Sequence, residues 1–222
     1  MSAEPGATRR QDDEQPSIGR MLSLSDGVVA IALTLLVLQL RVPPVHELTN
    51  QNSASELAAQ LGNGGDRLIS YGISFYIIAQ FWLIHHRVFR QISGHQEGLA
   101  WWNFAFLFTI TVMPFTSDLL GSYSENPLAV NIFAFNLLLA SLATLATLKL
   151  GQRRGLLTRQ ATRRSVRVSE LRSIIGAIIL VASMGVAWAN PDAAKYLWLL
   201  IAVAPGVATR WFDRSTRAQP AG

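Results

Sequence analysis

Residues 20–40 read RMLSLSDGVVAIALTLLVLQL, in which one arginine and one aspartate precede an uncharged and mostly apolar block. A helix that crosses the hydrocarbon core of a bilayer needs about 20 predominantly apolar residues. The stretch meets that length, so it predicts a membrane-spanning helix that begins near its charged end.

Five further apolar runs follow it. The six predicted spans are residues 22–40, 68–88, 99–120, 128–150, 174–188 and 194–211. We therefore predict an all-α membrane protein with six transmembrane helices in one unit, residues 20–212. A polar N-terminal tail, 1–19, is expected to be retained rather than cleaved as a signal peptide, and a C-terminal tail covers 213–222. The polar stretch 41–67 and the arginine-rich stretch 151–172 are expected to be loops.

The composition agrees with a membrane protein. Of the 222 residues, 50% are hydrophobic and 15% are charged, whereas soluble domains carry about 25% charged residues. The chain has no cysteine, which excludes disulfides, thiolate metal ligands and cysteine nucleophiles. Its net charge of +5 raises nucleic acid as a partner. However, no basic run is interleaved with aromatic residues that could stack on bases, so no nucleic-acid partner is expected.

The basic residues predict the orientation of the spans. With the N-terminus in the cytoplasm, most of the 19 lysines and arginines fall on the cytoplasmic side, as the positive-inside rule requires. Lysines are rare beside arginines, which fits a GC-rich bacterial genome. We expect a multi-pass protein of the bacterial inner membrane with both termini cytoplasmic. Membrane lipids are expected partners, because the arginine-rich loop could contact anionic head groups; a solvated charge run is an equally adequate interpretation.

The first span has two different faces. At 3.6 residues per turn, one face carries Leu24, Ile31, Thr34, Leu35 and Leu38. Asp26 lies on roughly the opposite face. A carboxylate at the mouth of a membrane helix indicates function unless it is paired or wet, but it could equally well cap the helix at the interface. The residues alone leave both interpretations open.

The same stretch resembles a known family. The pattern Arg20-x-x-x-Leu24-Ser25-Asp26 is similar to the Arg-x-x-x-Phe-Ser-Asp signature of the transmembrane protein 175 family, the lysosomal potassium channels of animals and their bacterial relatives. Residues 81–89, FWLIHHRVF, resemble the family's Trp-x-x-His-His-x-x-Phe segment. Residues 103–120 and 128–130 resemble parts of its third and fourth helices. Leu24 stands where the family has Phe, which removes an aromatic packing contact.

The resemblance implies a potassium channel in which the first helices of the assembly surround the pore. The family's narrowest point is a ring of Ile five residues after the Asp, which is Ile31 here. Further apolar rings are then expected at Leu35 and Leu38, with hydroxyl oxygens from Thr34 beside them. A narrow apolar ring forces an ion to shed water and favours potassium modestly over sodium. Because one unit supplies one first helix, a homotetramer is expected. Plain lipid-facing packing is the alternative for this stripe.

Polar residues near the start of the first span are expected to fix its rotation. Asp26 would lie behind the pore wall, with candidate partners Arg20, Ser25, His85, His86, Trp102 and Asn103. The two histidines point about 100° apart on a helix, and no Asp, Glu or Cys follows at the next turn. Hydrogen bonding between helices is therefore favoured over a metal site. No cofactor is expected, and potassium is the permeant ion. Cytoplasmic pH could modulate the histidines.

Rival functions are less well supported. A proton-coupled secondary transporter would use an intramembrane carboxylate and usually an inverted repeat, but Asp26 lies near one end of its helix and no repeat is visible. A membrane enzyme is not expected, because Ser117 and Asp118 lie at the opposite end of the helices from the His pair. A scaffold without transport stays an open alternative.

Overall fold

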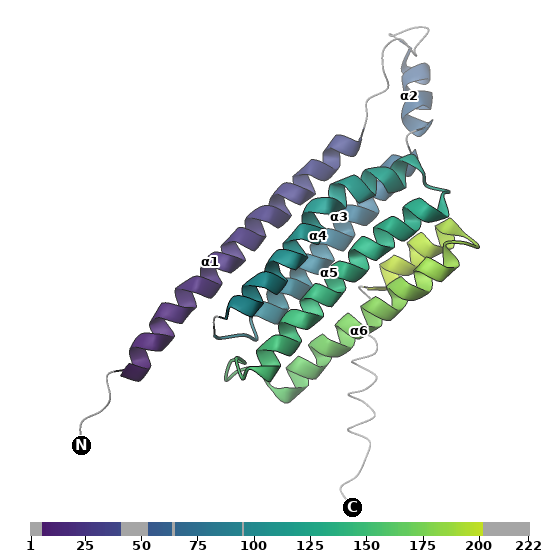
Figure 1. Ribbon diagram of the computed structural model, residues 1–222. Coiled ribbons are helices and arrows are strands. Elements are labelled where there is room, and N and C mark those ends of the chain that lie inside the picture. The colour runs from purple at the N-terminus through teal and green to yellow at the C-terminus, as the bar shows by residue number, and fades with distance from the viewer. Residues whose placement is uncertain (1–5, 41–52, 64, 95, 202–222) are drawn as a thin grey trace, which may run out of the picture.

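The computed structural model describes residues 6–40, 53–63, 65–94 and 96–201, and the described part is helical nearly throughout (Figure 1). The elements are α1 (Gly6–Leu35), a short 3-10 turn η1 (Leu36–Gln39), α2 (Ala54–Asn63), α3 (Gly65–Phe89), α4 (Glu97–Ser122), α5 (Pro127–Arg153) and α6 (Arg163–Val186). Residues 191–201 are helical again.

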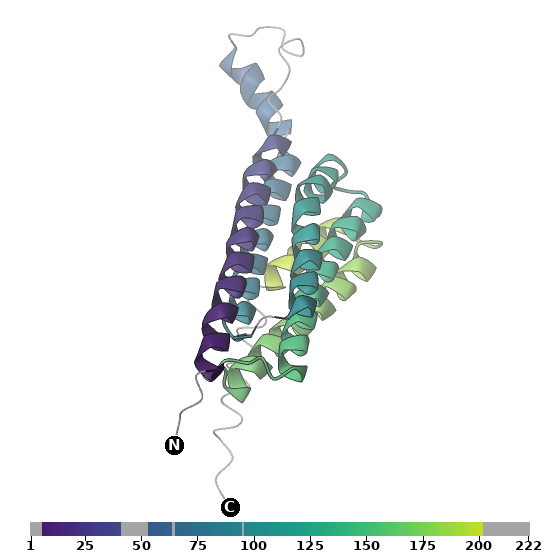
Figure 2. The same cartoon turned by 60° about the vertical axis from the view of Figure 1, so that its left-hand side comes forward.

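Five of the described helices are long and apolar enough to cross a membrane: Ile18–Gln39, Gly65–Phe89, Glu97–Ser122, Pro127–Arg153 and Arg163–Val186. They lie side by side, with α1 along one edge of the bundle and α6 toward the other (Figures 1 and 2). The prediction of a multi-pass α-helical membrane protein is therefore confirmed. The sixth predicted span, 194–211, extends past the last described residue, 201, and the predicted tail 213–222 lies outside the described residues.

Several predicted boundaries differ from the structure. The first helix begins at Gly6, so much of the predicted polar tail 1–19 is helical. The stretch 41–67 contains the ten-residue helix α2, which stands off the end of the bundle (Figure 2). Helix α6 begins at Arg163 rather than near 174. Arginine is a good helix former, so a basic stretch need not be a loop.

Local signals explain where the later helices begin. Asn126 accepts a hydrogen bond from the backbone N–H of Leu128 at 2.9 Å, and Pro127 occupies the first turn of α5. Thr162 accepts from the N–H of Ser165 at 3.1 Å and caps α6 in the same way. Such side chains satisfy N–H groups that have no partner within the helix, and they fix the α4–α5 and α5–α6 connections.

The main hydrophobic core joins buried residues of α1, α3, α4, α5 and α6 with the helical segment 191–201. Ile110, Phe133 and Leu137 are fully buried. The indole of Trp198, also fully buried, packs against the Phe133 ring with centroids 5.0 Å apart. Its Nε1–H donates to Ser183 Oγ at 2.9 Å, so the polar edge of the indole is satisfied inside an apolar core.

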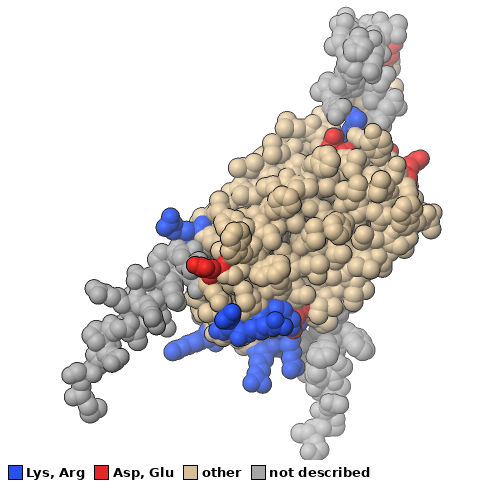
Figure 3. All heavy atoms as spheres, viewed as in Figure 1, with Lys and Arg blue, Asp and Glu red and all other residues tan. Residues whose placement is uncertain are grey.

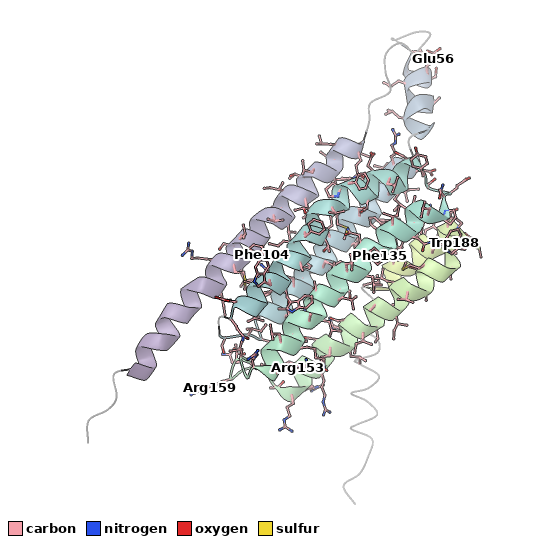
Figure 4. All side chains as sticks on the ribbon, in the orientation of Figure 1. Glu56, Phe104, Phe135, Arg153, Arg159 and Trp188 are labelled. Atoms are coloured by element: carbon pink, nitrogen blue, oxygen red, sulfur yellow. The ribbon has the colours of Figure 1, made fainter. Side chains whose placement is uncertain are left out.

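The two ends of the bundle differ in charge. We call the end that carries the α3–α4 and α5–α6 connections the basic end, because Lys and Arg gather there (Figure 3). Arg153 and Arg159 lie at this end and Glu56 at the other (Figure 4). The two connections also pair with each other: Ser93 N–H donates to Leu156 O at 2.8 Å, and Thr158 N–H to Gln91 O at 2.9 Å. Gly155, with φ of 68°, makes the turn that allows this pairing.

Candidate functional site

Helix α1 with η1 buries one face against α3 and α4 and leaves the other face uncovered in the single chain. Val29, Ala32 and Leu36 are buried at 3%, 2% and 0% exposure. On the uncovered face, Ile31 is 60%, Leu35 43% and Leu38 72% exposed, and Thr34 is exposed as well. The predicted stripe therefore faces away from its own bundle, as either a pore lining or a lipid-facing surface would.

A polar cluster fixes the buried face near the basic end. We call it the inner cluster, formed by Ser25 of α1, His85 of α3 and Asn103 of α4. Asn103 Nδ2 donates to Ser25 Oγ at 3.0 Å, and His85 Nε2 lies 2.7 Å from Asn103 Oδ1. Ser25 and Asn103 have no exposed surface. Three helices are thus joined at one buried amide.

The hydrogen bond to Asn103 also decides which ring nitrogen of His85 carries a proton. Asn103 Oδ1 can only accept, so in this arrangement His85 Nε2 must carry a proton. The His85 ring stacks on Phe106 with centroids 4.5 Å apart at 15°, and it lies 4.5 Å from the Phe89 ring. The imidazole is therefore held by a hydrogen bond at one edge and by aromatic rings on its faces.

Asp26 has a hydrogen-bond partner that was not predicted from the sequence. Trp82 Nε1 donates to Asp26 Oδ1 at 2.8 Å, at an exposed position. The His86 ring lies 5.6 Å from the Trp82 ring rather than in the inner cluster. Trp82 belongs to the segment FWLIHHRVF. It lies one helical turn before His86, which was a predicted partner of Asp26, so this spacing could have indicated Trp82 as a partner of Asp26 too.

The predicted polar partners are therefore divided. Ser25, His85 and Asn103 come together in the inner cluster, while Asp26 and His86 both meet Trp82. Arg20 and Trp102 are exposed. The hydrogen bonds thus form two separate groups, one around Asn103 and one at Asp26, and the role of these residues as one supporting network stays a prediction.

A second polar cluster, which we call the outer cluster, fixes the other end of the first span. Gln39 Nε2 donates to the carbonyl oxygen of Pro114 at 3.0 Å, and Ser117 Oγ donates to Gln39 Oε1 at 2.7 Å. Ser74 Oγ lies 2.6 Å from Ser117 Oγ. Gln39 was not among the predicted site residues, although Ser25 and Gln39 lie about four helical turns apart and so share a face.

The two clusters together determine the rotation of the first helix. Each joins α1 or η1 to both α3 and α4, one near each end of the span. Buried polar groups need partners, so a rotation about the helix axis that exposed Ile31 less would break both clusters. Among the described residues, no group of three His, Asp or Glu side chains converges to hold a metal.

The fold is that of a polytopic helical membrane protein. Its first helix buries one face and is hydrogen-bonded to α4 near both ends of the span. Residues 20–114 match the family described as the endosomal/lysosomal potassium channel TMEM175. The matched residues are a little under half of the chain, and they confirm the resemblance to this family that the signature predicted.

Individual relatives agree with the family match. A potassium channel of Chamaesiphon minutus is 34% identical over 116 residues, which are 52% of this chain and 55% of that protein. A potassium channel of Chryseobacterium sp. is 29% identical over 127 residues, 56% of this chain and 60% of that one. The human endosomal/lysosomal proton channel TMEM175 is 30% identical over 129 residues, 56% of this chain and 24% of that protein. The matches thus span little more than half the length of the bacterial relatives.

The fold is shared more widely than the sequence. The crystal structure of a lysosomal potassium-selective channel TMEM175 homologue from Chamaesiphon minutus superposes with a TM-score of 0.76. The superposition covers 88% of this chain and 99% of that one at 22% sequence identity. The described helices therefore have the arrangement of that structure.

Proposed function

We propose that the chain is one subunit of a cation channel that conducts potassium in modest preference to sodium, with α1 lining the pore. The observation that carries the proposal is the two-faced first helix. Polar clusters at both ends bury one face, and the stripe of Ile31, Leu35 and Leu38 stays exposed in the single chain. The names of its relatives, which include potassium channels and proton channels, support the same class of function.

The constriction is proposed at Ile31, with Leu35 and Leu38 as further apolar rings. Such a ring offers few oxygens in exchange for the water that an ion loses, and it can also gate by dewetting. Potassium loses its hydration water more readily than sodium, so the ring favours potassium. Thr34 lies on the same stripe, and its hydroxyl donates to the Ile31 carbonyl at 2.8 Å. The lone pairs of Thr34 Oγ1 consequently remain available to a passing cation.

Assembly and orientation are part of the proposal. One first helix cannot enclose a pore, so four copies are proposed to surround a common axis as a homotetramer. The excess of Lys and Arg at the basic end supports a cytoplasmic location for that end, in the inner membrane of a bacterium. No cofactor or catalytic activity is proposed.

The test is flux through liposomes that contain the purified chain. With potassium or sodium gradients, the unaltered protein should pass potassium faster than sodium. Ile31→Asn should move the potassium-to-sodium ratio toward one, because an amide in the ring compensates the dehydration of both ions. Ile178→Asn on α6 is the matched control, since Ile178 is 61% exposed and Ile31 60%; it should leave the ratio unchanged.

Three outcomes would refute parts of this proposal. An unchanged ratio in Ile31→Asn would remove Ile31 from the constriction. Saturable flux that depends on a proton gradient would indicate a proton-coupled carrier, and proton flux without potassium flux would change the permeant ion. A stably monomeric protein by light scattering in detergent would exclude the four-subunit pore.

A further inference from the structure

Helix α4 has an uncovered face that is rich in large aromatic side chains. At 3.6 residues per turn, five exposed residues share one side of the helix: Glu97, Trp101, Phe104, Phe108 and Phe115. Trp101 is 74% exposed, and Phe108 and Phe115 are each 68% exposed. We call this side the aromatic face. It begins with a carboxylate at the basic end and continues as aromatic rings along the membrane span.

Helix α1 has a second uncovered face beside the stripe of Ile31, Leu35 and Leu38, which we call the pore stripe. The second face begins with a charge and continues with small residues: Arg20, Ser23, Gly27, Ala30 and Thr34. The hydroxyls of Ser23 and Thr34 donate to backbone carbonyls of α1 itself at 3.0 Å and 2.8 Å, so they need no polar partner elsewhere. We call this side the flat face.

Packing inside the subunit does not explain the glycine on the flat face. A Cβ placed on Gly27 would meet no atom within 4 Å, yet glycine inside a helix costs about 0.5–1 kcal/mol relative to alanine. Between membrane helices, small residues allow two backbones to approach closely. The flat face is therefore suited to contact with a further helix outside its own bundle.

The two faces match in direction, spacing and charge. Both α1 and α4 run from the basic end toward the other end (Figure 1), so α1 of one copy and α4 of another can lie parallel. Gly27 follows Arg20 by seven residues, and Phe104 follows Glu97 by seven. When the two opposite charges meet, Phe104 therefore reaches the level of Gly27, about 10 Å further along the helices. Within the described part of the chain, neither Arg20 nor Glu97 has a salt-bridge partner.

The two faces also lie on opposite flanks of a subunit. Around α1, the flat face is centred about 80° from the pore stripe, on the side where Asp26 meets Trp82 of α3. The other side of the pore stripe is turned toward α4, to which Gln39 is bonded. Figure 2 shows α1 and α3 together on one side of the bundle and α4 on the other. A ring with the pore stripes innermost therefore brings the α3 flank of each subunit against the α4 flank of the next.

We propose that the aromatic face of α4 docks against the flat face of α1 in a second copy of the chain, with Glu97 beside Arg20 and Phe104 over Gly27. The inference rests on the proposed function for its ring of subunits, and it names the contact that closes this ring. Each first helix is then held by its own α3 and α4 on one face and by a neighbouring α4 on another, which leaves the pore stripe toward the axis.

Disulfide cross-linking tests the contact, because the chain has no cysteine of its own. The single-cysteine variants Gly27→Cys and Phe104→Cys are co-expressed with different affinity tags and oxidised in liposomes. A disulfide requires Cα atoms within about 7 Å of each other, so only a close contact is captured. This pair should give at least fivefold more covalent dimer of the two tagged chains than Gly27→Cys with Ile178→Cys, a control position on α6 that is 61% exposed.

Two further measurements do not depend on the reactivity of the cysteines alone. Gly27→Leu fills the space assigned to Phe104 and should raise the dissociation constant of the tetramer at least tenfold, measured by light scattering on dilution in detergent. Gly185→Leu on α6, where a Cβ also meets no atom within 4 Å, is the matched control and should change it less than twofold. Arg20→Glu and Glu97→Arg should each lower the cross-link yield about threefold, and the two changes together should restore it.

The outcomes distinguish this contact from the proposed function. A tetramer without the cross-link between positions 27 and 104 refutes the contact, leaves the pore, and means that lipid covers the aromatic face. A cross-linked tetramer that passes no potassium refutes the proposed function and supports the contact. A monomer refutes both. Phe104→Cys chains that cross-link to each other as readily as to Gly27→Cys chains indicate a two-fold arrangement and overturn the contact.

Discussion

Replacing Asn103 with leucine removes the buried amide that joins three helices. The His85 N–H then loses its acceptor at 2.7 Å, and the Ser25 hydroxyl keeps only its bond to the Met21 carbonyl at 2.9 Å. Leaving one buried donor unsatisfied costs about 1–3 kcal/mol, and a polar contact between membrane helices averages about 0.6 kcal/mol. We expect Asn103→Leu to lower the free energy of unfolding by about 2 kcal/mol.

The assay is unfolding in mixed detergent micelles by titration with a denaturing detergent, followed by circular dichroism. Asn136→Leu is a matched control, because Asn136 is also buried and donates to the Thr109 carbonyl at 3.0 Å, but joins α5 to α4 and not to α1. Both variants should lose stability. Only Asn103→Leu should also change the potassium-to-sodium ratio in liposomes, because only it releases the rotation of α1.

A double-mutant cycle of Ser25→Ala and Asn103→Leu isolates the contact between α1 and α4. The coupling energy should be about 0.5–1 kcal/mol. A coupling near zero, or an Asn103→Leu variant as stable as the unaltered protein, would refute the reasoning that the inner cluster holds the first helix.

Three further predictions concern other parts of the structure. Gln39→Leu leaves the Pro114 carbonyl and the Ser117 hydroxyl without Gln39 and should destabilise by about 1–2 kcal/mol; spin labels on η1 should become more mobile, and unchanged mobility would contradict the role of the outer cluster. Gly155→Ala should destabilise by about 1–2 kcal/mol because φ there is 68°, whereas Gly185→Ala, where a Cβ meets nothing within 4 Å, should be neutral or stabilising in the same unfolding assay. Trp82→Phe breaks the hydrogen bond to Asp26 at an exposed position and should cost less than about 1 kcal/mol; a larger loss would mean that Asp26 is structurally more important than its exposure suggests.

The gathering of basic residues at one end of the bundle could be predicted from the sequence, but the structure of the two connections at that end could not. The distribution of arginines places the charges at one end because they are expensive inside a bilayer. The pairing of residues 91–93 with 156–158 and the early start of α6 at Arg163 were not predicted. A run dominated by arginine has no apolar periodicity. It therefore shows neither where a helix begins nor which distant residues pair with its backbone.

The candidate site was predicted in part. Helical periodicity separated the stripe of Ile31, Leu35 and Leu38 from the rest of the first span, and these three side chains are exposed in the structure. Their role as a constriction stays a proposal. The partnership of Asp26 with Trp82 and the outer cluster around Gln39 were missed, because each depends on which neighbouring helix a given side chain reaches.

By itself, the sequence determined that the chain is a multi-pass helical membrane protein, since apolar runs of this length are stable only in a bilayer. It also carried the signature that connects residues 20–114 with the TMEM175 family. The tertiary structure decided which face of the first helix is buried. A helical repeat sets the angles between side chains on one helix, but the contacts of Ser25 and Gln39 with α3 and α4, far away along the chain, set how that helix is turned toward its neighbours.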